Sequence, residues 1–562
     1  MTEGTPPDQV RRKLLGGAVA VTLSSGVIAA IVERGAGDAG PLADAPAPQP
    51  PVGGGETLSG PATAPPTSAG GTPPPSATPD AVPATTPRPP TPGIAPRELS
   101  AAERRHHVAR RLTYGPTPAV LAEIESDGIE AFVARQLDPA SIDDTECEKM
   151  LVPLTLGESA NQIDSRESGL LARRNGLAIS HLQFATFVRA VHSRRQLHEV
   201  MVGFWTDHFN VWPGKERALR AEKPVDDETV ARQHALGTFR DLLQASAHSP
   251  AMLRYLDNHA SGAEDPNENY ARELLELHTV GIGNYSESDV AGAARIFSGW
   301  GIGHDHRFRF DPNDHATGRA EVAGWSTEGT GGHDDGKRLL DHLAAHPATA
   351  HHVVTKLARR FVRDDPPAVL VDRLVDVYSS NDTAIVPVLA ALFASDEFFA
   401  AYGTKLRRPF EFAAAAARLV GATVDTREPG AVGATIERLR AMGHAPFEWP
   451  GPDGYPDVSA AWLAPNDVMG RWTFAKLLGE NRLRGIEVQA QPVVGSTSGR
   501  SVADVADDLA RAVTIGPPPT HVVDAIVAAS GQEGATPFVE THDDALGTML
   551  ATAIVTAEVQ YR

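Results

Sequence analysis

The chain has 562 residues and a formal net charge of −20 at pH 7. Nucleic-acid binding requires a basic surface, which this composition does not supply. The single cysteine, Cys147, excludes an intrachain disulfide, a cysteine-based zinc site and an iron–sulfur cluster.

The first 45 residues have the features of an export signal. Arg11 and Arg12 precede an apolar run at 14–32, which is the twin-arginine arrangement of bacterial Tat signals, and Ala-Asp-Ala at 43–45 fits a cleavage site. The alternative is an uncleaved membrane anchor, since about 19 mildly apolar residues could just span a bilayer. Gly, Ser and Thr dilute the run and favour the signal. We therefore expect export by the Tat route to the extracellular space or cell envelope, with membrane contact only through an uncleaved signal.

Residues 46–97 are dominated by Pro, Gly, Ala, Thr and Ser. This composition has too few large apolar side chains to offset the entropy of ordering, so we expect a disordered, partly polyproline linker. The remaining residues, 98–562, are numerous enough to bury a large core.

From residue 98 onward, Ala, Leu, Glu and Arg recur at spacings of three and four, and strict alternation is scarce. We predict a mainly α fold for 98–562: a large multi-helix domain with irregular loops and at most a small β-hairpin, in 307–325. Residues 101–139 are expected to form two helices separated by a turn at 114–116.

Residues 265–281, DPNENYARELLELHTVG, are the densest polar segment. Asp265 is suited to cap a helix and Pro266 to occupy its first position. Gly281 is suited to end the helix. The pattern predicts an α-helix over 266–280.

On such a helix, Asn269, Arg272, Glu273 and Glu276 share one stripe, and His278 lies on the opposite, leucine-rich side. Two alternatives stay open for the stripe. It is either a solvated face with an Arg272–Glu276 pair, or it lines a cleft where Glu273 and Glu276 share a proton or hold a divalent cation. A regular helix cannot by itself bring both glutamates and His278 to one metal ion.

A second histidine is also predicted to face the core. Helical spacing aligns Leu197, Met201, Phe204 and His208 on one apolar face. Imidazole is a common metal ligand and a general base near neutral pH, so His208 and His278 become candidates if they converge. The alternative for each is an ordinary core histidine.

Two further candidates lie in expected turns. Asn258, in YLDNHAS, and His315, in NDHATG, each follow a helix or strand, where loops often present functional groups. The alternative is turn formation, because Asp and Asn readily cap their own backbone. HExxH, GxSxG, Walker A, CxxCH and a dinucleotide-binding GxGxxG are all missing from the sequence, so no motif specifies a reaction.

Several segments occur in the order seen in a bacterial family, domain of unknown function 1800: RLTYGPTP, FWTDHFNV, FRDLLQASAHSPAMLRYLDN, PNENYARELLELHTVG, SESDVAGAARIFSGW, HPATAHHVVTKLARRFV and APFEWPGPDGYPD. The chain resembles this family from about residue 100 to 562. The resemblance implies a large, exported, largely helical protein without an established activity, often encoded beside the exported family domain of unknown function 1501. The chain departs from the family at 315–318, where His-Ala-Thr-Gly replaces His-Asp-x-Gly, and in the closing TAEVQYR, which lacks the family's proline.

We therefore expect an exported, metal-assisted or acid/base, hydrolase-like enzyme acting on an extracellular substrate. The expected catalytic residues are Glu273, Glu276, His278 and Asn258. The expected ligands of a divalent metal are His208, His278, Glu276 and His315. The alternative is a non-catalytic secreted surface or scaffold protein that works with a co-encoded exported partner of the domain of unknown function 1501 family.

Overall fold

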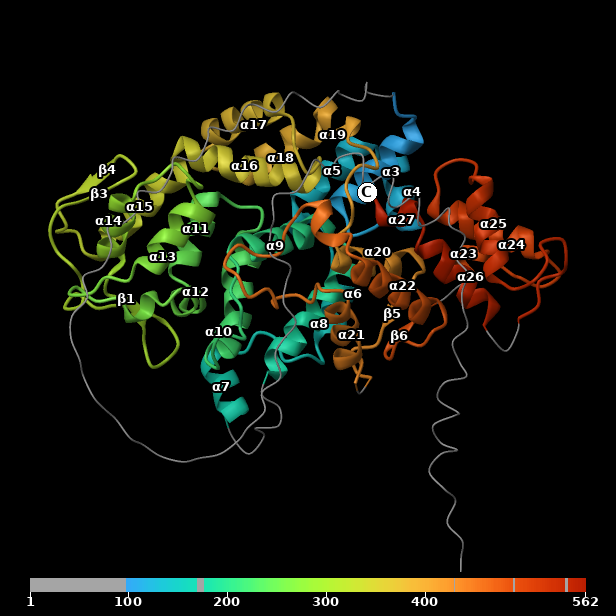
Figure 1. Cartoon of the computed structure of the whole chain (residues 1–562), viewed down its shortest axis with the longest axis horizontal. Helices are drawn as coiled ribbons and strands as arrows, with labels where there is room; N and C mark the ends of the chain where they lie inside the picture. Colours follow the sequence, from blue (N-terminus) through green and yellow to red (C-terminus); the bar gives the residue numbers. More distant parts are fainter. Residues whose placement is uncertain (1–97, 169–175, 429, 489–490, 541–543) are drawn as a thin grey trace, which may run out of the picture. The chain divides into compact units, whose positions relative to one another are not determined.

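Helices make up most of the described chain, which confirms the mainly α prediction (Figure 1). The computed structural model describes residues 98–168, 176–428, 430–488, 491–540 and 544–562. The predicted export signal at 1–45 and linker at 46–97 lie outside the described residues. Within the described ranges, no helix is both long and apolar enough to cross a membrane.

The helices before residue 300 are α3 (Ala101–Leu112), α4 (Pro118–Asp127), α5 (Ile129–Leu137), α6 (Thr145–Leu151), α7 (Ala160–Ser168), α8 (Leu177–His192), α9 (Gln196–His208), α10 (Leu219–Asp226), α11 (Phe239–Ala247), α12 (Pro250–Tyr255), α13 (Glu268–Glu273) and α14 (Glu287–Phe297). Two π-helical segments, Asp227–Arg232 and Leu274–His278, continue α10 and α13. Short 3-10 turns occupy Pro139–Ser141 and Asn258–Ala260.

The later helices are α15 (His333–Ala345), α16 (Pro347–Phe361), α17 (Ala368–Ser380), α18 (Ile385–Phe393), α19 (Asp396–Ala400), α20 (Pro409–Leu419), α21 (Ala431–Ala441), α22 (Pro465–Gly479), α23 (Gln491–Val494), α24 (Val502–Val513), α25 (Thr520–Ala529), α26 (Ala545–Ile554) and α27 (Ala557–Gln560). A 3-10 turn, Ser459–Trp462, precedes α22.

Residues 101–139 form three helices where two were predicted. The first begins at a capping box, in which the Ser100 side chain accepts from the backbone of Glu103 and the Glu103 side chain accepts from Ser100. It ends before the expected turn. The additional break falls at Gly128, whose φ of 91° is open to glycine but strained for other residues. A single glycine therefore separates α4 from α5.

The strands form two-stranded antiparallel sheets. β1 (Trp300–Ile302) pairs with β2 (Phe308–Phe310), and β3 (Ala320–Val322) pairs with β4 (Trp325–Thr327), with β3 packed against α14. The prediction of one hairpin within 307–325 is wrong in detail, because that segment holds β2 and β3, which belong to different hairpins. A third pair, β5 (Thr423–Val424) with β6 (Ile486–Glu487), joins residues too distant in sequence for a hairpin pattern to reveal.

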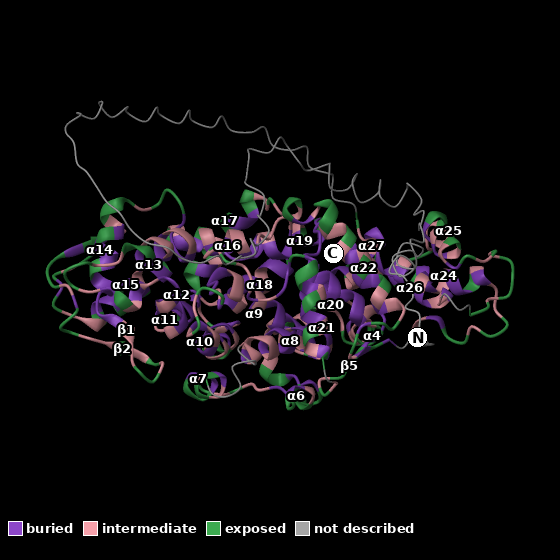
Figure 2. Ribbon diagram, turned by 60° about the horizontal axis from the view of Figure 1, so that its bottom comes forward, coloured by how far each residue is buried: buried purple, intermediate pink, exposed green. Residues whose placement is uncertain are grey.

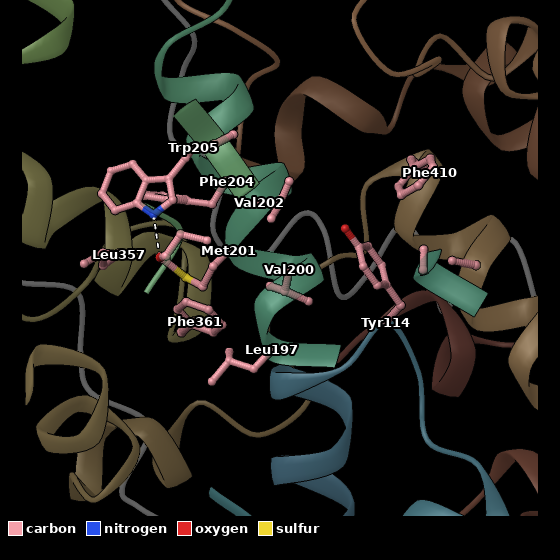
Figure 3. Close-up of a cluster of buried hydrophobic side chains, with 14 of the residues drawn as sticks. Tyr114, Leu197, Val200, Met201, Val202, Phe204, Trp205, Leu357, Phe361 and Phe410 are labelled. Carbon is pink, nitrogen blue, oxygen red and sulfur yellow. Dashed lines mark hydrogen bonds between the residues drawn. The ribbon is translucent and has the colours of Figure 1, made fainter. Parts of the chain in front are cut away.

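One large apolar cluster runs through the helical domain, with buried residues where helices meet and exposed residues on their outer turns (Figure 2). Helix α9 contributes Met201 and Trp205 to it, and α16 contributes Leu357 and Phe361 (Figure 3). The Trp205 indole donates to the carbonyl of Ala235 at 2.9 Å. Each fully buried side chain of this size contributes about 1.5 to 3 kcal/mol. The packing therefore fixes α9 and α16, the two helices that carry the site.

Candidate functional site

The helix predicted over 266–280 is shorter and less regular than expected. It begins at Glu268 and is capped by Asn267, whose side chain accepts from the backbone of Asn269 at 2.8 Å. The predicted cap at Asp265 is therefore wrong. Helix α13 then widens into the π-helical segment Leu274–His278 and ends as Gly281, at a φ of 83°, donates to the carbonyl of Leu275. Such π segments are rare and are frequent at functional sites.

Glu273 and Glu276 lie on the partly exposed side of this segment. Glu276 accepts a hydrogen bond from the Tyr285 hydroxyl, and burial together with the charge of Glu276 raises the pKa of Glu273. The expected Arg272–Glu276 pair does not form, because Arg272 binds Glu287 at 2.8 Å and Glu268 at 3.3 Å. Neither Glu273 nor Glu276 lines the main cavity.

Asn258 and His315 both donate hydrogen bonds to backbone carbonyls between α14 and β1. The fully buried Asn258 amide donates to the carbonyls of Phe297 and Trp300, at 3.1 and 3.0 Å. Nδ1 of His315 donates to the carbonyl of Ser298 at 2.9 Å. The two predicted functional residues therefore meet at the junction of α14 and β1, where both satisfy buried carbonyls.

The principal cavity has a volume of about 670 Å³. It lies between the C-terminal end of α9, the segment after the π-helix, one face of α16 and the loop at 453–457. Its charged and imidazole-bearing lining residues are Asp207, His208, His351, His352, Lys356, Arg359, Arg408, Asp453 and Asp457.

The buried side chain of His208 is fixed at both ring nitrogens. Its Nε2 lies 3.1 Å from the backbone carbonyl of His278, and its Nδ1 lies 2.8 Å from Nζ of Lys356. A carbonyl only accepts, so the ring proton is on Nε2 and Nδ1 accepts from Lys356. Burial, then the charge of Lys356, lowers the pKa of His208 well below its usual value. This imidazole is neutral and oriented.

His278 contributes its backbone to the site. The His208 and His278 rings have centroids 6.1 Å apart, and the ring of His278 packs against Phe209 at 5.0 Å. Burial lowers the pKa of His278 to about 3. The two predicted histidines therefore do come together, but His278 supplies the carbonyl that orients His208, and its imidazole does not line the cavity.

Lys356, which the sequence did not single out, is the central ionisable group. Its pKa falls to about 8, because burial disfavours the ammonium and Asp207 only partly offsets that effect. One helical turn earlier, His352 donates from Nε2 to the carbonyl of Leu277 at 3.0 Å. Burial, then Lys356, lowers the pKa of His352 to about 4. Lys356 thus contacts the neutral His208 and lies one helical turn from the neutral His352.

A buried ionic network lies behind Asp207 and Arg408, two lining residues of the cavity. Asp207 binds Arg408 at 2.6 Å, and Arg408 binds Glu411 at 2.8 Å. Glu411 also contacts Arg360 and Arg562, the latter at 3.3 Å. Breaking such a buried arrangement by removing one partner costs about 3 to 5 kcal/mol. The network therefore holds Asp207 in place.

The loop at 453–457 approaches α9 through a glycine. Gly454 has a φ of 71°, and a Cβ built there would lie 2.1 Å from the backbone oxygen of Asp207. Asp457 in the same loop binds Lys405 at 3.0 Å. The missing side chain of Gly454 allows the loop backbone to approach the backbone of Asp207, and the Asp457–Lys405 ion pair fixes the end of the loop.

The predicted ligands do not form one metal site. Across the described ranges, no group of three or more His, Cys, Asp or Glu side chains is placed to hold a metal ion. His208 has both nitrogens in hydrogen bonds, Glu276 binds Tyr285 and His315 binds Ser298. The described structure therefore does not bring His208, His278, Glu276 and His315 together as one ligand set, because the fold uses these groups in separate contacts.

Asp207, His352 and Lys356 line the cavity but were not among the predicted site residues, although two features of the sequence point to them. Asp207 directly precedes the chosen His208, and His352 and Lys356 are spaced i,i+4, which places them on one helix face. The spacing does not show that this face meets the end of α9, because that contact depends on packing between distant segments.

The family model described as protein of unknown function (DUF1800) matches residues 107–561 of the chain. Comparisons with curated proteins and with solved structures found no match.

Proposed function

We propose that this chain, which belongs to the DUF1800 family, is an acid–base enzyme. Lys356 is the group that transfers the proton. The observation that carries the proposal is the 2.8 Å contact between Nζ of Lys356 and the neutral His208 on the wall of a cavity of about 670 Å³. The predicted twin-arginine segment supports an extracellular substrate.

A lysine pKa of about 8 suits general-base catalysis, since a base works best when its pKa lies near the working pH. The neutral Lys356 amine takes a proton from water or from a substrate hydroxyl in the cavity. The resulting ammonium then donates a proton to the leaving group. His208 orients Nζ throughout, because the carbonyl of His278 fixes its accepting nitrogen toward Lys356.

The acid–base form of the proposal is favoured over the metal-assisted form by the state of His208. Both of its nitrogens have partners, so binding a metal would require it to release Lys356 or the carbonyl of His278. The site as folded therefore favours proton transfer by side chains.

The test is hydrolysis of a panel of ester, amide and glycoside substrates by the full chain and by Lys356→Met. Loss of a general base reduces the rate by about 10²- to 10⁴-fold. Lys337→Met, which removes an exposed lysine on α15, is the matched control and should retain the wild-type rate. An inactive wild type across the panel, or full activity in a folded Lys356→Met protein, would favour the non-catalytic alternative.

A further inference from the structure

The charged groups of the cavity differ in whether a partner neutralises them. Asp207 is paired with Arg408 at 2.6 Å and Asp457 with Lys405 at 3.0 Å. Lys356 and Arg359, both on α16, have no carboxylate within 4 Å among the residues that the structure describes. Among the described residues, neither Lys356 nor Arg359 therefore has an ion-pair partner in the cavity.

Both side chains also have free hydrogen-bonding capacity. Lys356 uses one donor on His208, and Arg359 uses Nε on the carbonyl of Asp364 at 3.0 Å, which leaves its two terminal nitrogens available. The spacing i,i+3 puts both side chains on one face of α16. Directly before Lys356 in sequence, the buried hydroxyl of Thr355, another lining residue, has no hydrogen-bond partner in the described chain.

Among the described residues, three carboxylates near Lys356 favour its ammonium, and two of them, Asp207 and Asp457, are paired with other cations. Asp453 lines the cavity, accepts from the Trp449 indole at 2.8 Å and has no ion-pair partner among the described side chains. It is exposed to solvent, where screening weakens its effect. Lys356 and Arg359 are partly buried, so their attraction for an anion is screened less.

We infer that the substrate of this site carries an oxyanion, a carboxylate, phosphate or sulfate group, bound between Lys356 and Arg359. The inference rests on the proposed function, because it names the substrate class of the same cavity. An oxyanion there accepts charge-assisted hydrogen bonds from the guanidinium of Arg359. It also accepts a hydrogen bond from an N–H of Lys356, which the neutral amine of the proposed base still offers. The remainder of the substrate occupies the apolar part of the cavity, beside Leu277 and Val280.

The experiment measures acetylation of Lys356 by acetic anhydride in the full-length protein, followed by peptide mass spectrometry. Acetate, phosphate and sulfate are each compared with chloride at constant ionic strength. At least one oxyanion should slow labelling of Lys356 several-fold and saturably, and the anion that protects best identifies the chemical group. Protection should be lost in Arg359→Met and kept in Arg427→Met, which removes an exposed arginine whose side chain forms no hydrogen bond or ion pair with the described residues.

Labelling at a series of pH values in chloride alone separates this inference from the proposed function. A Lys356 pKa near 8 without protection by any oxyanion would overturn the inference and leave the proposed base intact. An ordinary lysine pKa would overturn the proposal that Lys356 is a general base. Saturable protection in the oxyanion series would still support oxyanion binding in that case. Equal protection in wild type and a folded Arg359→Met protein would remove Arg359 from the site.

Discussion

His208 and His352, from different helices, bind consecutive backbone carbonyls: Nε2 of His208 lies 3.1 Å from the oxygen of His278, and Nε2 of His352 lies 3.0 Å from the oxygen of Leu277. The last carbonyls of a helix lack partners within it. The two imidazoles satisfy these carbonyls where the π-helical segment ends. The same contacts align both rings beside Lys356, so the irregular helix end and the site depend on each other.

Lys356 is expected to lower stability at neutral pH. Its folded-state pKa of about 8 lies below the unfolded value of about 10.4, so folding disfavours its charged form. This destabilisation is complete below pH 8 and disappears as pH rises from about 8 to above 10, because the unfolded state binds more protons in that window. Lys356→Met should therefore melt at a higher temperature than wild type at pH 7, and the difference should shrink toward pH 10.

Only the mutant-minus-wild-type difference isolates Lys356. Asp207 on α9 and Asp453 and Asp457 in the facing loop favour its ammonium, whereas Arg359 on its own helix disfavours it. Lys337→Met supplies the control for the loss of one exposed lysine. A melting difference that does not change with pH would contradict the lowered pKa.

Gly454 is expected to be irreplaceable in the loop over α9. In Gly454→Ala, the left-handed backbone costs about 1 to 3 kcal/mol. The new Cβ would also lie 2.1 Å from the backbone oxygen of Asp207, which has to move. Gly403→Ala is the matched control, since Gly403 has a similar φ of 67° but no atom within 4 Å of the added Cβ.

Urea denaturation of both glycine variants separates conformational strain from the contact with Asp207. Gly454→Ala should lose more unfolding free energy than Gly403→Ala. It should also change the acetylation rate of Lys356, because Asp207 faces that amine. Equal destabilisation of the two variants would show that the loop does not press on α9.

Sequence patterns predicted the helical class because spacing of three and four persists over most of 98–562. They also placed His208 correctly on the buried face of its helix. They failed at 274–278, where the assumption of 3.6 residues per turn does not apply to a π-helix. Arg272 binds Glu287 and Glu268, and its pairing with Glu276, one of the two alternatives for this stripe, is absent.

The composition of the cavity was beyond sequence reasoning for a different reason. Asp207, Lys356 and Asp453 come from segments separated by about a hundred residues or more, and their meeting depends on the packing of α9 against its neighbours. A local pattern also cannot show whether the Asn258 amide is catalytic or instead donates hydrogen bonds that stabilise the backbone. Only its two carbonyl partners show the second role.

Asn258 is therefore expected to affect stability and leave the properties of Lys356 unchanged. Asn258→Ala would leave the buried carbonyls of Phe297 and Trp300 without these donors, and an unsatisfied buried polar group costs about 1 to 3 kcal/mol. Asn381→Ala removes a comparable amide-to-carbonyl bond on an exposed surface and should cost much less. Chemical denaturation measures both. A change in the Lys356 labelling profile of folded Asn258→Ala would instead connect the junction of α14 and β1 to the site.

Glu411 is expected to be the most sensitive member of the buried ionic network. Its side chain is 1 % exposed and faces Arg360, Arg408 and Arg562, which together lower its pKa well below the usual value. Glu411→Gln leaves these guanidinium groups without their shared anion, so we expect a loss of about 3 to 5 kcal/mol. The matched control is Glu397→Gln, which breaks a more exposed pair with Arg373 and should cost about 0 to 1 kcal/mol.

The contribution of Glu411 to stability should depend on pH. A carboxylate whose pKa is lowered in the folded state stabilises the protein at pH values above its unfolded-state pKa. That contribution is lost as pH falls below about 4.3, the unfolded value for glutamate, toward the lower folded value. Wild type should therefore lose stability on acidification more steeply than Glu411→Gln, as measured by urea denaturation at pH 5, 4 and 3. Parallel pH dependences for the two proteins, or a Glu411→Gln loss as small as that of Glu397→Gln, would show that the network does not hold the cavity wall.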